Sequence, residues 1–176
     1  KDNAIRFAYI KASEGTSNRD RYFKRNAENA HKHGIKVGAY HLLTTRSSPE
    51  TQFQNFLKNV GDTHVDLIPA IDIEANLIHD KKMVGYAKRL SNLMQKHYGR
   101  KPLIYTSSDV YNFRLHPDFA SYYLWISAYS RRCPLLRGET HINIWQYTER
   151  GNIDGYANHI DLNCFVNGMT IDKLLL

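Results

Sequence analysis

The sequence predicts one α/β domain built on a mostly parallel β-sheet. Apolar strand-like runs alternate with amphipathic helical runs up to Gly99, which is typical of parallel sheets with crossover helices. The chain has 176 residues, which suits one domain, and its content of 42% hydrophobic and 23% charged residues is that of a folded protein. No repeat or low-complexity linker divides it.

The expected elements follow from the spacing of apolar residues. Seven runs have strand character: 5–13, 35–43, 65–74, 102–107, 122–129, 141–148 and 159–165. Three runs have helical spacing: 20–34, 48–60 and 81–99. Gly34 and Gly99 are well placed to end helices, and Ser48 followed by Pro49 is a favourable helix start. After Gly99 the intervals between strands leave little room for full helices.

The run "LIPAIDIEAN" places two carboxylates at the end of an apolar strand. Asp72 and Glu74 are two residues apart, so their side chains point to the same face. Active and binding sites in parallel sheets and barrels lie at the carboxyl ends of the strands. Two neighbouring carboxylates repel, so one holds its proton to higher pH, and an acid beside an ionised partner is what glycosidic bond cleavage requires. A capped strand end whose acids bind loop amides or an arginine is the alternative.

Acids and aromatic residues stand at the ends of nearly every other expected strand. Taken together they indicate a carbohydrate-binding cleft, although any one of them could belong to the core or rim. The candidate site residues outside the acid pair are Glu14, Tyr40, Tyr105, Trp125, Trp145, Gln146 and Asp161.

Other classes of function receive little support. The net charge of +7 favours polyanions, but no nucleic-acid-binding motif accompanies the scattered basic residues, so no nucleic acid partner is expected. The nine histidines show no metal-ligand spacing, and neither a metal nor a cofactor is expected. No apolar stretch is long enough to cross a membrane. Cys133 and Cys164 could form one bridge or remain two thiols.

Several motifs, in order along nearly the whole chain, resemble the glycoside hydrolase family 25 lysozymes. They are "FAYIKASEGT", "KVGAYHLL", "PAIDIEAN", "PLIYTSS", "LWISAY" and "INIWQYTERGNIDGYANHIDLNCF". The resemblance implies an irregular TIM-like (β/α) barrel with reduced helices in its C-terminal half. It also implies hydrolysis of the β-1,4 bond between N-acetylmuramic acid and N-acetylglucosamine in peptidoglycan, without a metal or cofactor.

The resemblance also implies residue roles. Glu74 would be the general acid and base, Asp72 would support the reacting sugar, and Asp161 would be a further acid in the cleft. Tyr40, Tyr105 and Trp145 match aromatic positions that hold substrate, and Glu14 and Gln146 match polar positions at its rim.

The family opens with a strand carrying Asp-x-Ser, and this sequence starts after it. Residues 1–176 are therefore expected to be a single catalytic domain truncated at its N-terminus, acting as a monomer on peptidoglycan strands outside the cytoplasm, with no export signal in the chain. Two alternatives remain: a chitinase-like hexosaminidase sharing the D-x-E motif, and a cell-wall glycan-binding module without turnover.

Overall fold

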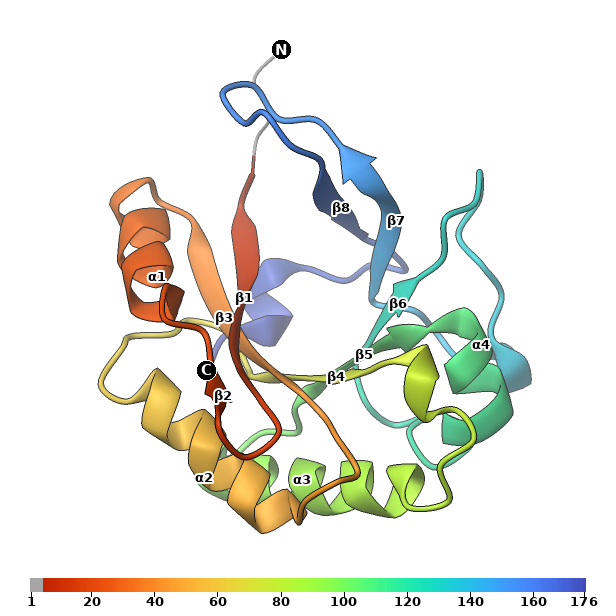
Figure 1. Ribbon diagram of the computed structural model, residues 1–176. Helices are drawn as coiled ribbons and strands as arrows, with labels where there is room; N and C mark the ends of the chain where they lie inside the picture. Colours follow the sequence, from red (N-terminus) through yellow and green to blue (C-terminus); the bar gives the residue numbers. More distant parts are fainter. Residues whose placement is uncertain (1–4) are drawn as a thin grey trace.

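The strands form one curled sheet in the computed structural model, which describes residues 5–176 (Figure 1). Its order is β2-β1-β3-β4-β5-β6-β7-β8. The bounds are β1 (Phe7–Glu14), β2 (Asn18–Arg19), β3 (Lys36–Leu42), β4 (Ala70–Ile73), β5 (Leu103–Ser107), β6 (Leu124–Ser127), β7 (Ile144–Gly151) and β8 (Ile160–Phe165). The six strands β1, β3, β4, β5, β6 and β7 pair in parallel in this order. At the two edges, β2 is antiparallel to β1 and β8 is antiparallel to β7.

All seven expected strands are present, which confirms the α/β fold. β2 was not expected, because two residues are too few to show a pattern. The antiparallel direction of β8 follows from its connection: β7 and β8 are joined by a short loop, whereas a parallel strand needs a long crossover. In the described part of the chain the sheet order ends at β2 and β8, so the sheet is a curled half-barrel and not a closed barrel.

Three full helices precede β5, and only short helical turns follow it. The bounds are α1 (Phe23–Lys32), α2 (Pro49–Val60), η1 (Ala75–Leu77), α3 (Met83–Tyr98), α4 (Ser108–Val110), η2 (Tyr111–Leu115), η3 (Arg137–Glu139) and η4 (Ile171–Leu174). The Ser48 hydroxyl accepts the Thr51 N–H at the start of α2, and Gly99 ends α3 with φ of 72°. Within residues 5–176, no helix combines the length and the apolar character that crossing a membrane requires.

Each strand divides its side chains between an outer core and an inner face. In β4, Ile71 and Ile73 belong to the outer core, which includes the apolar sides of α2 and α3, whereas Ala70 lies in the inner cluster. The helices α2 and α3 contact each other along one side of the sheet (Figure 1). Since faces alternate along a strand, Asp72 and Glu74 face inward with Ala70.

The C-terminal segment closes one end of the inner face. Leu67 pairs with Leu175 in an isolated bridge, the Ile68 N–H donates to the Leu174 carbonyl at 2.8 Å, and Leu174 is fully buried. These contacts lie before β4 begins, at the amino ends of the parallel strands. The inner face is therefore filled at that end, and the carboxyl ends of the strands are left to form a cavity.

Candidate active site

A cavity of about 720 Å³ lies on the inner face of the sheet, where Asp72 and Glu74 are placed. This volume is within the usual range for ligand sites, roughly 300–1,000 Å³. Seven of the expected site residues line it: Tyr40, Asp72, Glu74, Tyr105, Trp125, Gln146 and Asp161. They come from β3, β4, β5, β6, β7, β8 and the residue after β4, so the curled sheet gathers positions that are far apart in the chain.

The two acids at the end of β4 have different surroundings. Asp72 is buried, and its Oδ1 atom has no hydrogen-bond partner in the described chain, whereas Glu74 is exposed in the cavity. Burial, followed by the negative charge of Glu74, raises the pKa of Asp72 from 3.8 to about 7. Asp72 therefore retains its proton toward neutral pH.

Tyr40 and Tyr105 lie close enough to Asp72 and Asp161 for these acids to affect their pKa values. Burial first, and then the charges of Asp72 and Asp161, raise the pKa of Tyr40. Burial also raises the pKa of Tyr105. Both phenols are therefore neutral hydrogen-bond donors. Asp161 is exposed on β8, and burial followed by the charge of Glu149 raises its pKa as well.

Gln146 anchors the polar wall of the cavity. Its Oε1 atom accepts hydrogen bonds from the hydroxyls of Tyr105 at 2.9 Å and Tyr129 at 3.0 Å. These bonds hold the buried amide in place and leave its NH₂ group to donate. Tyr129 ends the expected strand 122–129 but was not among the expected site residues.

Trp125 forms the apolar floor and presents little surface to a ligand. It is 8% exposed, its Nε1–H donates to Asn163 at 2.7 Å, and its ring lies 4.7 Å from that of Tyr105 and 5.2 Å from that of Tyr9. Aromatic rings whose centroids lie at these distances attract one another. Trp125 therefore supports the cavity more than it offers a stacking surface.

Two expected site residues lie outside the cavity lining. Trp145 packs against the outer core and its Nε1–H donates to the Ala128 carbonyl at 2.8 Å. Ile144 and Gln146 face inward, so Trp145 between them must face outward. Glu14 pairs with Lys11 at 2.7 Å and accepts from Asn18. Neither Trp145 nor Glu14 is therefore placed to contact a ligand in this cavity.

Tyr9 lines the cavity and was not expected there. It follows Phe7 on the inner face of β1, and its hydroxyl donates to the Ile68 carbonyl at 2.9 Å. Gly38 is its register partner on β3, and a Cβ at Gly38 would clash with Cε1 of Tyr9. The glycine in "KVGAY" is thus the sequence signal for a ring lying against β3.

Replacing Gly38 with Ala is expected to destabilise the protein. The added methyl group must displace the Tyr9 ring, and overpacking of this kind costs about 1–3 kcal/mol. Chemical denaturation measures the change. Gly85→Ala is the matched control, because that exposed glycine of α3 has nothing within 4 Å of a new Cβ, and it should be neutral or stabilising. Equal effects of the two changes would contradict the prediction.

Cys133 and Cys164 are both free in the structure. Cys164 lines the cavity next to Asn163, while Cys133 packs against the outer core. Burial raises the pKa of both thiols, so neither is an activated nucleophile.

Inward-facing carboxylates at the ends of parallel strands, within a cavity walled by aromatic and amide side chains, are typical of glycoside hydrolases. The sequence matches the model of the glycosyl hydrolases family 25 over residues 1–156. The chain belongs to this family.

Relatives with solved structures share the fold. A family 25 glycosyl hydrolase from Bacillus anthracis is 33% identical, with a TM-score of 0.84, and the match covers 97% of this chain and 83% of that one. A bacterial lysozyme from Streptomyces coelicolor is 28% identical, also with a TM-score of 0.84, over 96% and 84% of the two chains.

The protein YegX of Escherichia coli K12 is 33% identical over 99% of this chain, which spans 64% of the length of YegX.

Proposed function

We propose that the protein is a lysozyme that hydrolyses the β-1,4 bond between N-acetylmuramic acid and N-acetylglucosamine in peptidoglycan. Its family membership and its similarity to a bacterial lysozyme support this proposal. The observation that carries it is the arrangement at β4: Glu74 is exposed in the cavity, and the buried Asp72 beside it has an Oδ1 atom without a partner.

Glu74 is the general acid and base in this proposal. Its exposure in the cavity lets it meet the glycosidic oxygen of a bound glycan, to which it gives a proton as the bond to the anomeric carbon breaks. The resulting carboxylate then takes a proton from the water that attacks the anomeric carbon. The net reaction adds one water across the bond, and Glu74 regains its proton.

Asp72 orients the reacting sugar. An acetamido N–H is a donor of the kind that its unpartnered Oδ1 atom lacks, and such a bond favours the ionised carboxylate. Held in this way, the acetamido carbonyl can stabilise the positive charge that develops at the anomeric carbon. Asp161 adds a further negative charge to the wall, and the hydroxyl of Tyr40 donates to sugar oxygens.

Residues 1–176 act as one catalytic domain, because the described strands all belong to a single sheet around one cavity. The domain works as a monomer on cell-wall glycans outside the cytoplasm. A net charge of +7 favours association with the anionic polymers of such walls.

Digestion of purified peptidoglycan tests the proposal. Products are reduced with borohydride and analysed by mass spectrometry, and muramic acid is expected at the new reducing ends. Release of reducing ends from chitin and none from peptidoglycan would assign the protein to the chitinase-like hexosaminidases instead. Retention on peptidoglycan without release of any product would identify a binding module and overturn the catalytic proposal.

A further inference from the structure

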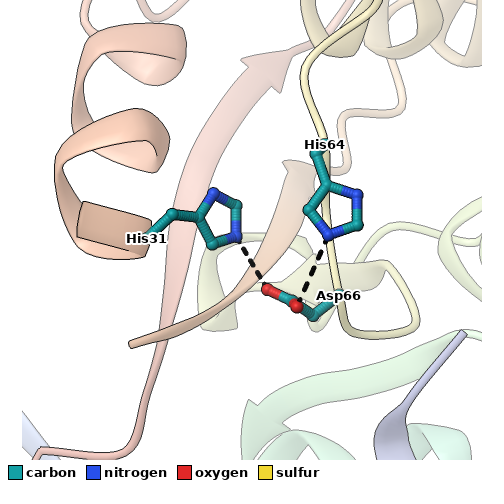
Figure 2. Close-up of side chains that lie close together, drawn as sticks. All are labelled: His31, His64 and Asp66. Carbon is teal, nitrogen blue, oxygen red and sulfur yellow. Dashed lines mark hydrogen bonds and ion pairs between the residues drawn. The ribbon is translucent and has the colours of Figure 1, made fainter. Parts of the chain in front are cut away.

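Two histidines and an aspartate meet outside the cavity. His31 lies in the last turn of α1, and His64 and Asp66 lie in the segment between α2 and β4. The Nε2 atom of His31 is 2.8 Å from Oδ2 of Asp66, and that of His64 is 3.5 Å from Oδ1. Figure 2 shows both rings directing a nitrogen at the one carboxylate. One ligand atom from each residue lies within 4.8 Å of the others.

This cluster is separate from the proposed catalytic site. Asp66 accepts the backbone N–H of Val37 at 2.9 Å, near the start of β3, whereas Asp72 and Glu74 lie beside and beyond its carboxyl end. The length of β3 is roughly 20 Å, since a strand rises about 3.3 Å per residue. An ion bound by the cluster would therefore have no contact with a glycan in the cavity.

The geometry of the three side chains suits a transition-metal ion. Imidazole nitrogens and carboxylate oxygens bind Zn²⁺ at about 2.0–2.2 Å, which places tetrahedral ligand atoms roughly 3.3 Å apart. The Nε2 atoms of His31 and His64 approach different oxygens of Asp66, at 2.8 and 3.5 Å. One ligand atom from each of the three residues lies within 4.8 Å of the others, so a small rotation of the His64 ring would bring all three to a common ion. The Asp66 side chain is 6% exposed and held by the Val37 N–H, while the His64 side chain is 75% exposed and free to adjust.

We propose that His31, His64 and Asp66 bind a divalent transition-metal ion of the zinc class, with water completing the coordination. Such an ion would join the C-terminal end of α1 to the segment that leads into β4. The site would be structural, since it is remote from the cavity. It is independent of the proposed lysozyme function.

Lys36 competes with the ion for the carboxylate. Its Nζ atom lies 2.8 Å from Oδ1 of Asp66, and a nearby ammonium group opposes a second cation. The Lys36 side chain is 50% exposed, so it can turn into solvent when the ion binds. Removing this positive charge should therefore strengthen metal binding, whereas a histidine–aspartate pair with no affinity for metal would show no such response.

Spacing within the sequence did not reveal this site. The nearest histidine to His31 is His33, which is exposed and instead bonds its Nδ1 to the Asn29 carbonyl. The true neighbours of His31 are more than thirty residues further along the chain. Only the packing of α1 beside the start of β3 brings them together.

Titration of metal-free protein with Co²⁺ tests the proposal, because visible absorption bands report the coordination of this ion. We expect saturation at one equivalent, displacement by Zn²⁺, and a higher Tm when Zn²⁺ is present. His64→Gln should weaken Co²⁺ binding by about tenfold or more, since it removes a ligand from an exposed position. Lys36→Met should strengthen it.

His33→Gln is the matched control, because it removes an exposed histidine two residues from His31 that is outside the cluster. Its Co²⁺ affinity should equal that of the wild type. Circular dichroism checks that each variant is folded. The proposal is overturned if the wild type takes up no stoichiometric ion, or if His64→Gln and His33→Gln bind Co²⁺ equally well. The assay contains no glycan, so its outcome does not depend on the catalytic proposal.

Discussion

Glu74→Gln is expected to lower the rate of peptidoglycan hydrolysis by about 100-fold or more. A general acid or base contributes about 10²–10⁴ to the rate of such a reaction, and Gln cannot give a proton to the glycosidic oxygen. The side chain is exposed in the cavity, so the substitution leaves the packing of β4 unchanged. The release of reducing ends measures the rate, and glycan binding should persist.

Glu28→Gln is the control for this change. Glu28 is exposed on α1, outside the cavity, and its replacement likewise converts a carboxyl group to an amide. It should retain the activity of the wild type, which separates the loss of a proton donor from a general effect of charge. A Glu74→Gln variant that turns over peptidoglycan as fast as Glu28→Gln would rule out Glu74 as the general acid.

The sequence was most informative where strand periodicity and local motifs agree. The seven expected strands and three long helices are all present, and the alternation in "AIDIE" correctly places Asp72 and Glu74 on one face. Capping at Ser48 and Gly99 could be predicted because it depends on a few adjacent residues.

Features that depend on the curvature of the sheet could not be predicted in this way. Adjacent residues of a strand face opposite sides, so Trp145 and Gln146 cannot both point into the cavity. The sequence does not show which of the two faces inward, and the structure shows that it is Gln146. Tyr9 and Gly38 lie on two neighbouring strands, and the periodicity of the sequence does not determine the register between these strands. The cluster around Asp66 likewise depends on tertiary packing.

The unequal burial of the two acids also required the structure. The sequence indicated that one of them would hold its proton to higher pH, and burial raises the pKa of Asp72 in the structure. The proposed proton donor is nevertheless Glu74, because it is the exposed partner. The two assignments are compatible if substrate binding ionises Asp72 through an N–H bond to its unpartnered oxygen.

Asp72→Asn is expected to reduce hydrolysis strongly while making the protein more stable above pH 7. The folded protein holds the Asp72 proton up to a pKa of about 7, whereas the unfolded chain releases it near 3.8. Between these values the folded state binds more protons, so stability falls as the pH rises through this window. This increase in the pKa of Asp72 corresponds to a loss of at most roughly 4 kcal/mol in the free energy of unfolding. Asn has no charge to bury, so the variant avoids this cost.

Unfolding by urea at pH 5 and pH 8 measures the effect, and the informative quantity is the difference between wild type and variant. Burial lowers the pKa of His41 to about 4, so its contribution is lost as the pH falls from 6.5, which is the opposite direction. That contribution is common to both proteins and cancels in the difference. The advantage of Asp72→Asn should therefore be larger at pH 8 than at pH 5.

Asp154→Asn, at an exposed position outside the cavity lining, supplies the comparison and should leave the stability close to that of the wild type. A stability gain for Asp72→Asn that is equal at both pH values would mean that the carboxyl is not held protonated by burial. A gain that grows with pH, together with lost hydrolysis, would show that the protein carries a destabilising buried acid because the reaction needs it. This is the pattern expected where a buried, incompletely satisfied group serves catalysis.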